Sequence, residues 1–199
     1  MGLSMEEICN DALGLIGENP ITDINENETK AIRCRQFWQP TVQACLRMHT
    51  WNFATRRALL SMCAEAPAFG YSFAYQVPAD CLYLAKVTDD VSDIDSSDIS
   101  AAQVEYKVEY GQVLSSSEVL YCKYVCNVVE TGRFDPLFAS YVSARLASKI
   151  AASLTKSAAI VNSTIQLAVS ILSDAWAADV RESGTAAVRK SSSWLASRG

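Results

Sequence analysis

The sequence predicts a mainly α-helical fold with a small antiparallel β-sheet inserted between two helical parts. Apolar side chains recur at three- and four-residue steps in residues 4–48 and again in residues 135–182. This spacing places side chains on one face of a helix, so both regions are predicted to be helical. Residues 61–127 instead contain short segments rich in Val, Tyr and Leu, separated by proline and glycine, which is typical of strands. We therefore expect a bundle of long helices that carries a small sheet.

The domain organisation follows from the same patterns. A chain of 199 residues has the length of one domain, and we assign residues 1–183 to it, with the β-rich insertion at about 61–127. Residues 184–199 have no helical period and no acidic residue, and they contain three serines in a row. We expect this segment to be a flexible C-terminal tail that folds only on a partner.

The first helix is expected to begin at a capping box formed by Ser4 and Glu7 and to end before Gly17. Its expected apolar face is Ile8, Ala12, Leu15 and Ile16.

The second helix is expected to begin at Asn27, a good N-cap residue, and to contain Pro40, which should kink it. From Trp51 onward the apolar period shifts toward two, so the helix should hand over to a strand with Trp51 buried at the junction. The expected apolar face of this helix is Ala31, Cys34, Trp38, Val42, Cys45 and Met48.

Strands are expected at residues 73–77, 82–87, 103–110 and 119–125, with residues 111–118 connecting two of them as a hairpin. Five aspartates lie at 89, 90, 93, 95 and 98. They lack the Gly and the terminal Glu of a calcium-binding loop, so a solvated loop is the expected structure.

The third helix is expected to begin at Asp135 and Pro136, an N-cap followed by the one helical position that tolerates proline well. Its expected apolar face is Phe138, Val142, Leu146 and Ile150. After a break at 155–157, a fourth helix is expected to bury Ile160, Thr164, Leu167, Ile171, Ala175 and Ala178.

Residues 157–173 of this fourth helix carry no charge. The stretch is shorter than the ~20 apolar residues that span a membrane and contains polar side chains, so we expect it to be buried between protein surfaces. Its many small residues suit contact with a second subunit, and an intramolecular Ala-rich bundle is the alternative.

No catalytic, cofactor or metal site is predicted. His49 is the only histidine, and Cys45, one turn away, belongs to an apolar helix face, so both are expected to pack in the core. Cys122 and Cys126 lie about 13 Å apart if they share a strand, too far for one metal ion. The seven scattered cysteines indicate reduced thiols rather than a disulfide framework.

The charge balance argues against a nucleic-acid binder. Lys and Arg number 17 and Asp and Glu number 22, which gives a net charge of −5. A net acidic surface suits a channel that DNA passes without binding. Arginines 33, 35, 56 and 57 are accordingly expected to be solvated or to lie at a protein interface.

The C-terminal tail contains the candidate binding residues. Trp and Arg are enriched at binding hot spots, and Trp194 and Leu195 form an apolar pair close to Arg198. We expect these three residues to dock on a partner protein.

Several motifs, in order along nearly the whole chain, resemble the head-to-tail adaptor family of short-tailed bacteriophages, also called tail tubular protein A. One is Trp51-Asn52-Phe53-Ala54-Thr55-Arg56-Arg57-Ala58-Leu59. The others are the stretches 12–18 (ALGLIGE), 75–82 (YQVPADCL), 106–111 (YKVEYG), 135–138 (DPLF) and 193–198 (SWLASR).

This resemblance implies a non-enzymatic structural protein of the virion that is assembled in the host cytoplasm. It implies a twelve-fold ring that joins the portal protein to the tail nozzle, with genomic DNA passing through its lumen. On this basis we expect Trp194, Leu195 and Arg198 to dock on the portal, a monomer in isolation, and no cofactor, metal or membrane. A tail-associated peptidoglycan hydrolase and a DNA-binding module are the alternatives.

Overall fold

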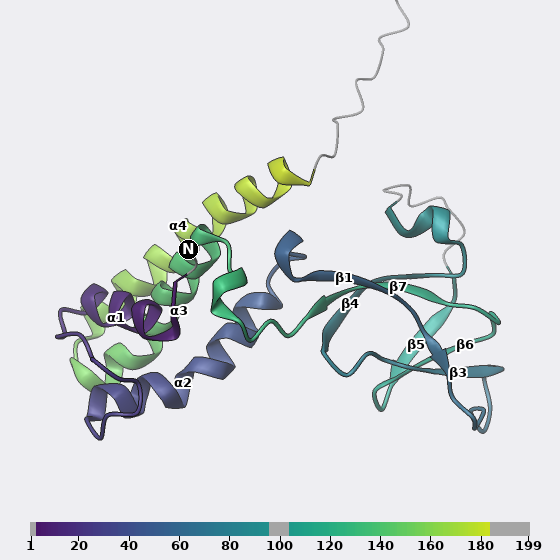
Figure 1. Cartoon of the computed structure of the whole chain (residues 1–199), viewed down its shortest axis with the longest axis horizontal. Helices are drawn as coiled ribbons and strands as arrows, with labels where there is room; N and C mark the ends of the chain where they lie inside the picture. Colours follow the sequence, from purple (N-terminus) through teal and green to yellow (C-terminus); the bar gives the residue numbers. More distant parts are fainter. Residues whose placement is uncertain (1–2, 96–103, 184–199) are drawn as a thin grey trace, which may run out of the picture.

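The computed structural model describes residues 3–95 and 104–183, which form a mixed α/β fold of four α-helices and two small antiparallel sheets. The helices gather on one side of the molecule and the strands on the other (Figure 1). Helices and antiparallel strands were both expected, but the sequence predicted one sheet and the structure has two.

Helix α1 (Met5–Leu15) begins as expected. The Glu7 N–H donates to Ser4 Oγ at 3.2 Å, and the Ser4 N–H donates to Glu7 Oε2 at 2.6 Å, which completes the capping box. Gly17 has a φ of +81°, the left-handed conformation that ends many helices. The expected face is wrong at Leu15, which is exposed, because the helix turns Leu13 toward the core instead.

Helix α2 (Thr29–Leu46) contains Pro40, as expected, but its N-cap is Glu28 rather than Asn27. Most of its predicted apolar face is buried, with Trp38 half-buried. Met48 is exposed, contrary to expectation, because the helix ends at Leu46 and the chain has already turned away.

Helices α3 (Pro136–Leu154) and α4 (Ala158–Glu182) form a hairpin. Asp135 Oδ1 accepts the N–H groups of Leu137 and Phe138, which confirms the predicted cap. All four residues of the predicted α3 face are buried. Helix α3 packs against α1, α2 and α4, so it is the centre of the bundle.

The first sheet contains the strand that follows α2 and the strand that precedes α3. It has the order β1-β7-β4, formed by Thr55–Leu59, Tyr121–Cys126 and Cys81–Thr88. Trp51 is followed by the 3₁₀ turn η1 (Asn52–Ala54), and β1 begins at the next residue, Thr55. The predicted change from helix to strand is therefore confirmed.

The second sheet has the order β2-β3-β6-β5. Its strands are β2 (Ser61–Met62), β3 (Phe73–Gln76), β6 (Gln112–Ser115) and β5 (Tyr106–Glu109). Residues 111–118 were expected to connect two strands, yet 112–115 are strand β6. The actual turn is Tyr110-Gly111, whose φ angles of 47° and 74° are typical of a two-residue type I′ hairpin.

Trp51 lies where the helical bundle meets the first sheet, and it is only 1% exposed. Its indole N–H donates to the Cys45 carbonyl at 3.1 Å, and its ring packs edge-on against Phe138 at 5.0 Å. The predicted burial of Trp51 at this junction is confirmed. The residue connects the end of α2, the start of β1 and the face of α3 in one core.

Candidate functional site

The tail residues predicted to dock on a partner, Trp194, Leu195 and Arg198, lie outside the described residues. Their docking therefore stays a prediction. The described part of the chain ends at Ser183, one residue after α4, where the Ser183 Oγ donates to the Asp179 carbonyl.

Helix α4 presents one apolar flank to solvent. Ile165, Val169, Trp176 and Val180 are separated by steps of four, seven and four residues, so they align on one side of the helix. Their exposed fractions are 40%, 63%, 39% and 55%, respectively. We call these four residues the α4 stripe. Large apolar side chains exposed in a row are a candidate contact surface.

The other side of α4 packs against α3. Thr164, Ala168 and Ala175 are buried there. The predicted buried face of α4 is confirmed at Thr164 and Ala175 only. Leu167 is 37% exposed, and the neighbouring Ala168 is buried instead. The other three predicted residues are half-buried: Ile160, Ile171 and Ala178. The sequence predicts that α4 lies between two protein surfaces. Within a single chain, the structure shows one of these two contacts, the contact with α3.

Among the described residues, α4 is the one helix that is long and apolar enough to cross a membrane by length and composition. Its apolar window is only 22% buried. However, Ser163, Ser170 and Asp174 are exposed on the flank away from the α4 stripe. A helix with one apolar flank and a flank that carries polar side chains is amphipathic.

The last turn of α4 is anchored by a hydrogen-bond cluster around Asp179, whose side chain is 9% exposed. One carboxylate oxygen accepts the backbone N–H of Asn52 at 2.9 Å, and the other accepts His49 Nε2–H at 3.0 Å. The Asn52 side chain also donates to the Asp179 carbonyl at 2.7 Å. This cluster fixes α4 to the corner between α2 and β1.

Sequence reasoning placed His49 in the core and missed its partner. Asp179 is a buried acid on α4, but nothing in the local sequence links it to His49. The distance along the chain, 130 residues, is what concealed the pair.

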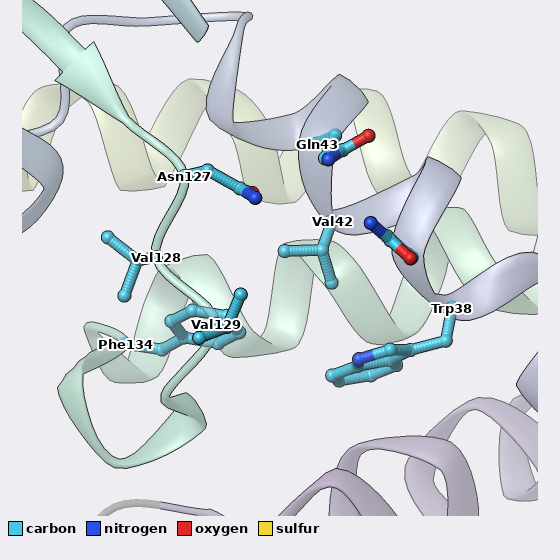
Figure 2. A pocket seen from close by; sticks show the side chains of 8 residues that line it. Trp38, Val42, Gln43, Asn127, Val128, Val129 and Phe134 are labelled. Carbon is cyan, nitrogen blue, oxygen red and sulfur yellow. The ribbon is translucent and has the colours of Figure 1, made fainter. Parts of the chain in front are cut away.

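A second apolar surface is a cleft between α2 and the connection from β7 to α3. Figure 2 shows the side chains of Trp38, Val42 and Gln43 on α2 opposite Asn127, Val128, Val129 and Phe134 on this connection. The cleft has a volume of about 210 Å³, and Gln39 completes its lining. None of the eight lining residues is charged. We call this surface the α2 cleft.

The expected core position is confirmed for Cys45, which is 1% exposed, but not for His49, which is half-buried with its side chain 24% exposed. Burial raises the pKa of the Cys45 thiol to about 12, so it stays protonated at neutral pH, whereas a nucleophilic cysteine needs the thiolate. His49 bonds Asp179 and packs its ring against Trp51 at 5.0 Å.

Cys122 and Cys126 both lie on β7 and are buried. Within residues 3–95 and 104–183, the structure has no group of three or more His, Cys, Asp or Glu side chains that could hold a metal ion. Asp95, one of the five aspartates, pairs with Arg57 at 2.8 Å and with Lys123 at 3.3 Å.

The four arginines weighed as DNA contacts make intramolecular bonds. Arg56 pairs with Asp80 at 2.8 Å, and Arg57 pairs with Asp95 as described above. Arg33 donates to the Gln36 side chain, and Arg35 donates to backbone carbonyls of the loop between α1 and α2. Each of the four guanidinium groups thus has at least one partner within the chain.

Comparison with models of known protein families and with curated proteins finds no match in either case. The candidate contact surfaces of the described residues are two uncharged ones, the α4 stripe and the α2 cleft.

Proposed function

We propose that this chain is a structural subunit of a phage virion, a head-to-tail adaptor that joins the portal to the tail nozzle as a homo-dodecameric ring around the DNA channel. The α4 stripe is the observation that carries this proposal furthest. A 25-residue helix that packs against its own chain on one side and exposes apolar residues on the other is suited to contact between subunits.

The order of motifs that resembles the adaptor family supports the same proposal. The residues of its motif at 51–59 have structural roles in this fold: Trp51 fills the junction core, Asn52 bonds Asp179, and Arg57 pairs with Asp95. The motif therefore accounts for how the helical bundle joins the first sheet, and it contains no group set for catalysis.

Charge supports passage of DNA rather than its capture. The net charge of −5 repels phosphate, and four of the arginines are already bonded within the chain. Zymography on peptidoglycan and a salt-dependent DNA mobility-shift assay test the two alternatives, a hydrolase and a DNA-binding module. We expect both assays to be negative.

The assembly state is the direct test of the proposal. We expect a monomer in isolation at micromolar concentration and a ring when the portal protein of the same phage is added. Light scattering after size-exclusion chromatography measures the first state, and negative-stain microscopy of the mixture shows the second. A stable ring without portal would contradict the monomer expectation, and no ring with portal would contradict the proposed function.

Truncation after Ser183 tests the tail. The cut removes nothing from the described fold and keeps the Ser183 bond to Asp179, so the thermal midpoint should barely move. Affinity for the portal should fall at least about tenfold, or about 1.4 kcal/mol, because the tail contributes Trp194, Leu195 and Arg198 as anchors.

The matched control keeps the tail length and replaces only those three residues by alanine. It should weaken portal binding as much as the truncation does. Equal binding by the truncated and full-length chains would show that the helical body contains the portal interface instead.

A further inference from the structure

We propose that the α4 stripe of one copy packs into the α2 cleft of a second copy of this chain. The proposal rests on the proposed function, in which copies lie side by side in a ring, and it names the two surfaces that make the lateral contact. The contact is heterologous, since each copy uses its α4 stripe on one side and its α2 cleft on the other.

The size of α4 fits such a contact. Twenty-five residues extend about 37 Å, and the outward half of a cylinder of that length and ~10 Å diameter has an area of about 600 Å². A standard protein interface buries about 800 Å² on each partner. One face of α4 therefore provides most of the area that one side of a stable interface needs.

The α2 cleft fits an apolar side chain from such a helix. Its volume of about 210 Å³ exceeds the ~150 Å³ of an apolar cavity known to bind benzene. Trp38, Val42 and Phe134 form its apolar lining (Figure 2). Val129 at its rim is 75% exposed, so apolar surface continues outside the cleft and can contact the rest of the helix.

No charged side chain opposes contact between the two surfaces of two copies. The α4 stripe and the residues that line the α2 cleft are all uncharged, so burying them together removes no charge from water. Each copy has a net charge of −5, so two copies repel at long range. Association should therefore be weak at low salt and should strengthen as salt screens that repulsion.

The fold places the two surfaces so that they cannot meet within one chain. Helix α3 lies between α2 and α4 and packs against both (Figure 1). A protein with two complementary surfaces on different sides associates head-to-tail, and such contacts close into rings when the rotation allows.

Photo-crosslinking of the full chain, without portal, tests the contact. A benzoyl-phenylalanine at Val169, which is 63% exposed, is irradiated in a concentrated mixture of light and heavy isotope-labelled protein. We expect mixed-isotope crosslinks from position 169 to residues 38–43 and 127–134, with a yield that rises with salt. Crosslinks to 158–182 of the second copy would show a symmetric α4 pair and overturn the proposal. Crosslinks to 184–199, or none, would also overturn it.

Charge variants give a complementation test by sedimentation of concentrated protein. Val169→Glu blocks the α4 stripe and Val129→Glu blocks the rim of the α2 cleft, and both residues are exposed enough for folding to survive. Each variant alone should associate at least about tenfold more weakly, which corresponds to about 1.4 kcal/mol. An equimolar mixture should regain a one-to-one dimer, because each variant supplies the surface that the other lacks.

The control is Val91→Glu, an equally exposed valine on η2 (Val91–Asp95), outside both surfaces. It should associate as the unmodified chain does. Failure of the mixture to regain association overturns the proposal. If the variants still form rings on the portal, the adaptor function stands and the lateral contact lies elsewhere. If crosslinks appear but no portal ring forms, the contact stands and the adaptor function fails.

Discussion

Replacing Trp51 by alanine should lower the free energy of unfolding by about 3–5 kcal/mol, the range seen when a large buried aromatic is truncated. The side chain is 1% exposed and packs edge-on against both His49 and Phe138 at 5.0 Å. Its removal leaves a cavity where α2, β1 and α3 meet. It also leaves the Cys45 carbonyl without the indole N–H that it accepts at 3.1 Å.

Urea unfolding followed by circular dichroism measures this loss. Two variants separate its parts. Trp51→Phe keeps most of the apolar volume but removes the indole N–H, so its loss should be smaller. Phe69→Ala removes an aromatic ring that is 88% exposed and should change stability by less than about 0.5 kcal/mol. A loss for Trp51→Ala as small as that of Phe69→Ala would contradict the role of Trp51 at this junction.

The helices were predictable because their signals are local. The capping box at Ser4, the cap and proline at Asp135 and Pro136, and the four-residue steps of α3 each involve residues within a few positions of one another. The errors are at the ends. Glu28 rather than Asn27 is the N-cap of α2, and Met48 lies beyond the last residue of the helix. The position of a helix end varies by one or two residues because it depends on the contacts of the chain that follows.

The sheets were harder to predict because strand pairing is not local. Strand β1 pairs with β7, matching Thr55 with Val125, and the turn-like residues Gly111 and Ser115–Ser117 concealed β6. Which strands share a sheet depends on contacts between distant segments. The sequence therefore indicated most of the strands, missed β2 and β6, and combined two sheets into one.

The candidate surfaces show the same limit. The uncharged run on α4 was visible in the sequence, and so was its suitability for a second subunit. The α2 cleft was not, because it forms only when residues 127–134 fold back over α2. The anchor between His49 and Asp179 joins residues 130 positions apart and has no local signal.

Replacing Asp179 by alanine should cost about 2–3 kcal/mol, because it removes two hydrogen bonds to a carboxylate and leaves a donor unpaired. The backbone N–H of Asn52 loses its acceptor at 2.9 Å, and His49 loses its partner at 3.0 Å. The bond from the Asn52 side chain to the Asp179 carbonyl can persist, since alanine keeps that carbonyl. The loss should therefore be centred on the Asn52 amide.

Urea unfolding and amide hydrogen exchange together measure this effect. Asp179→Asn is the conservative variant, since its amide oxygen can still accept the Asn52 N–H and its amide N–H can donate to His49 Nε2 in the tautomer that carries its proton on Nδ1. It should cost about 1 kcal/mol or less, a single neutral hydrogen bond at most. Asp174→Ala removes an exposed aspartate from the same helix and should stay within about 0.5 kcal/mol.

Exchange of the Asn52 amide distinguishes anchoring from general destabilisation. In Asp179→Ala it should exchange faster relative to the amides of α3, whereas in Asp179→Asn it should keep its protection. Because the same carboxylate positions the last turn of α4, the alanine variant should also free the end of the α4 stripe around Trp176 and Val180. If Asp179→Ala costs no more than Asp174→Ala, this carboxylate does not anchor α4, and packing against α3 alone must hold the helix in place.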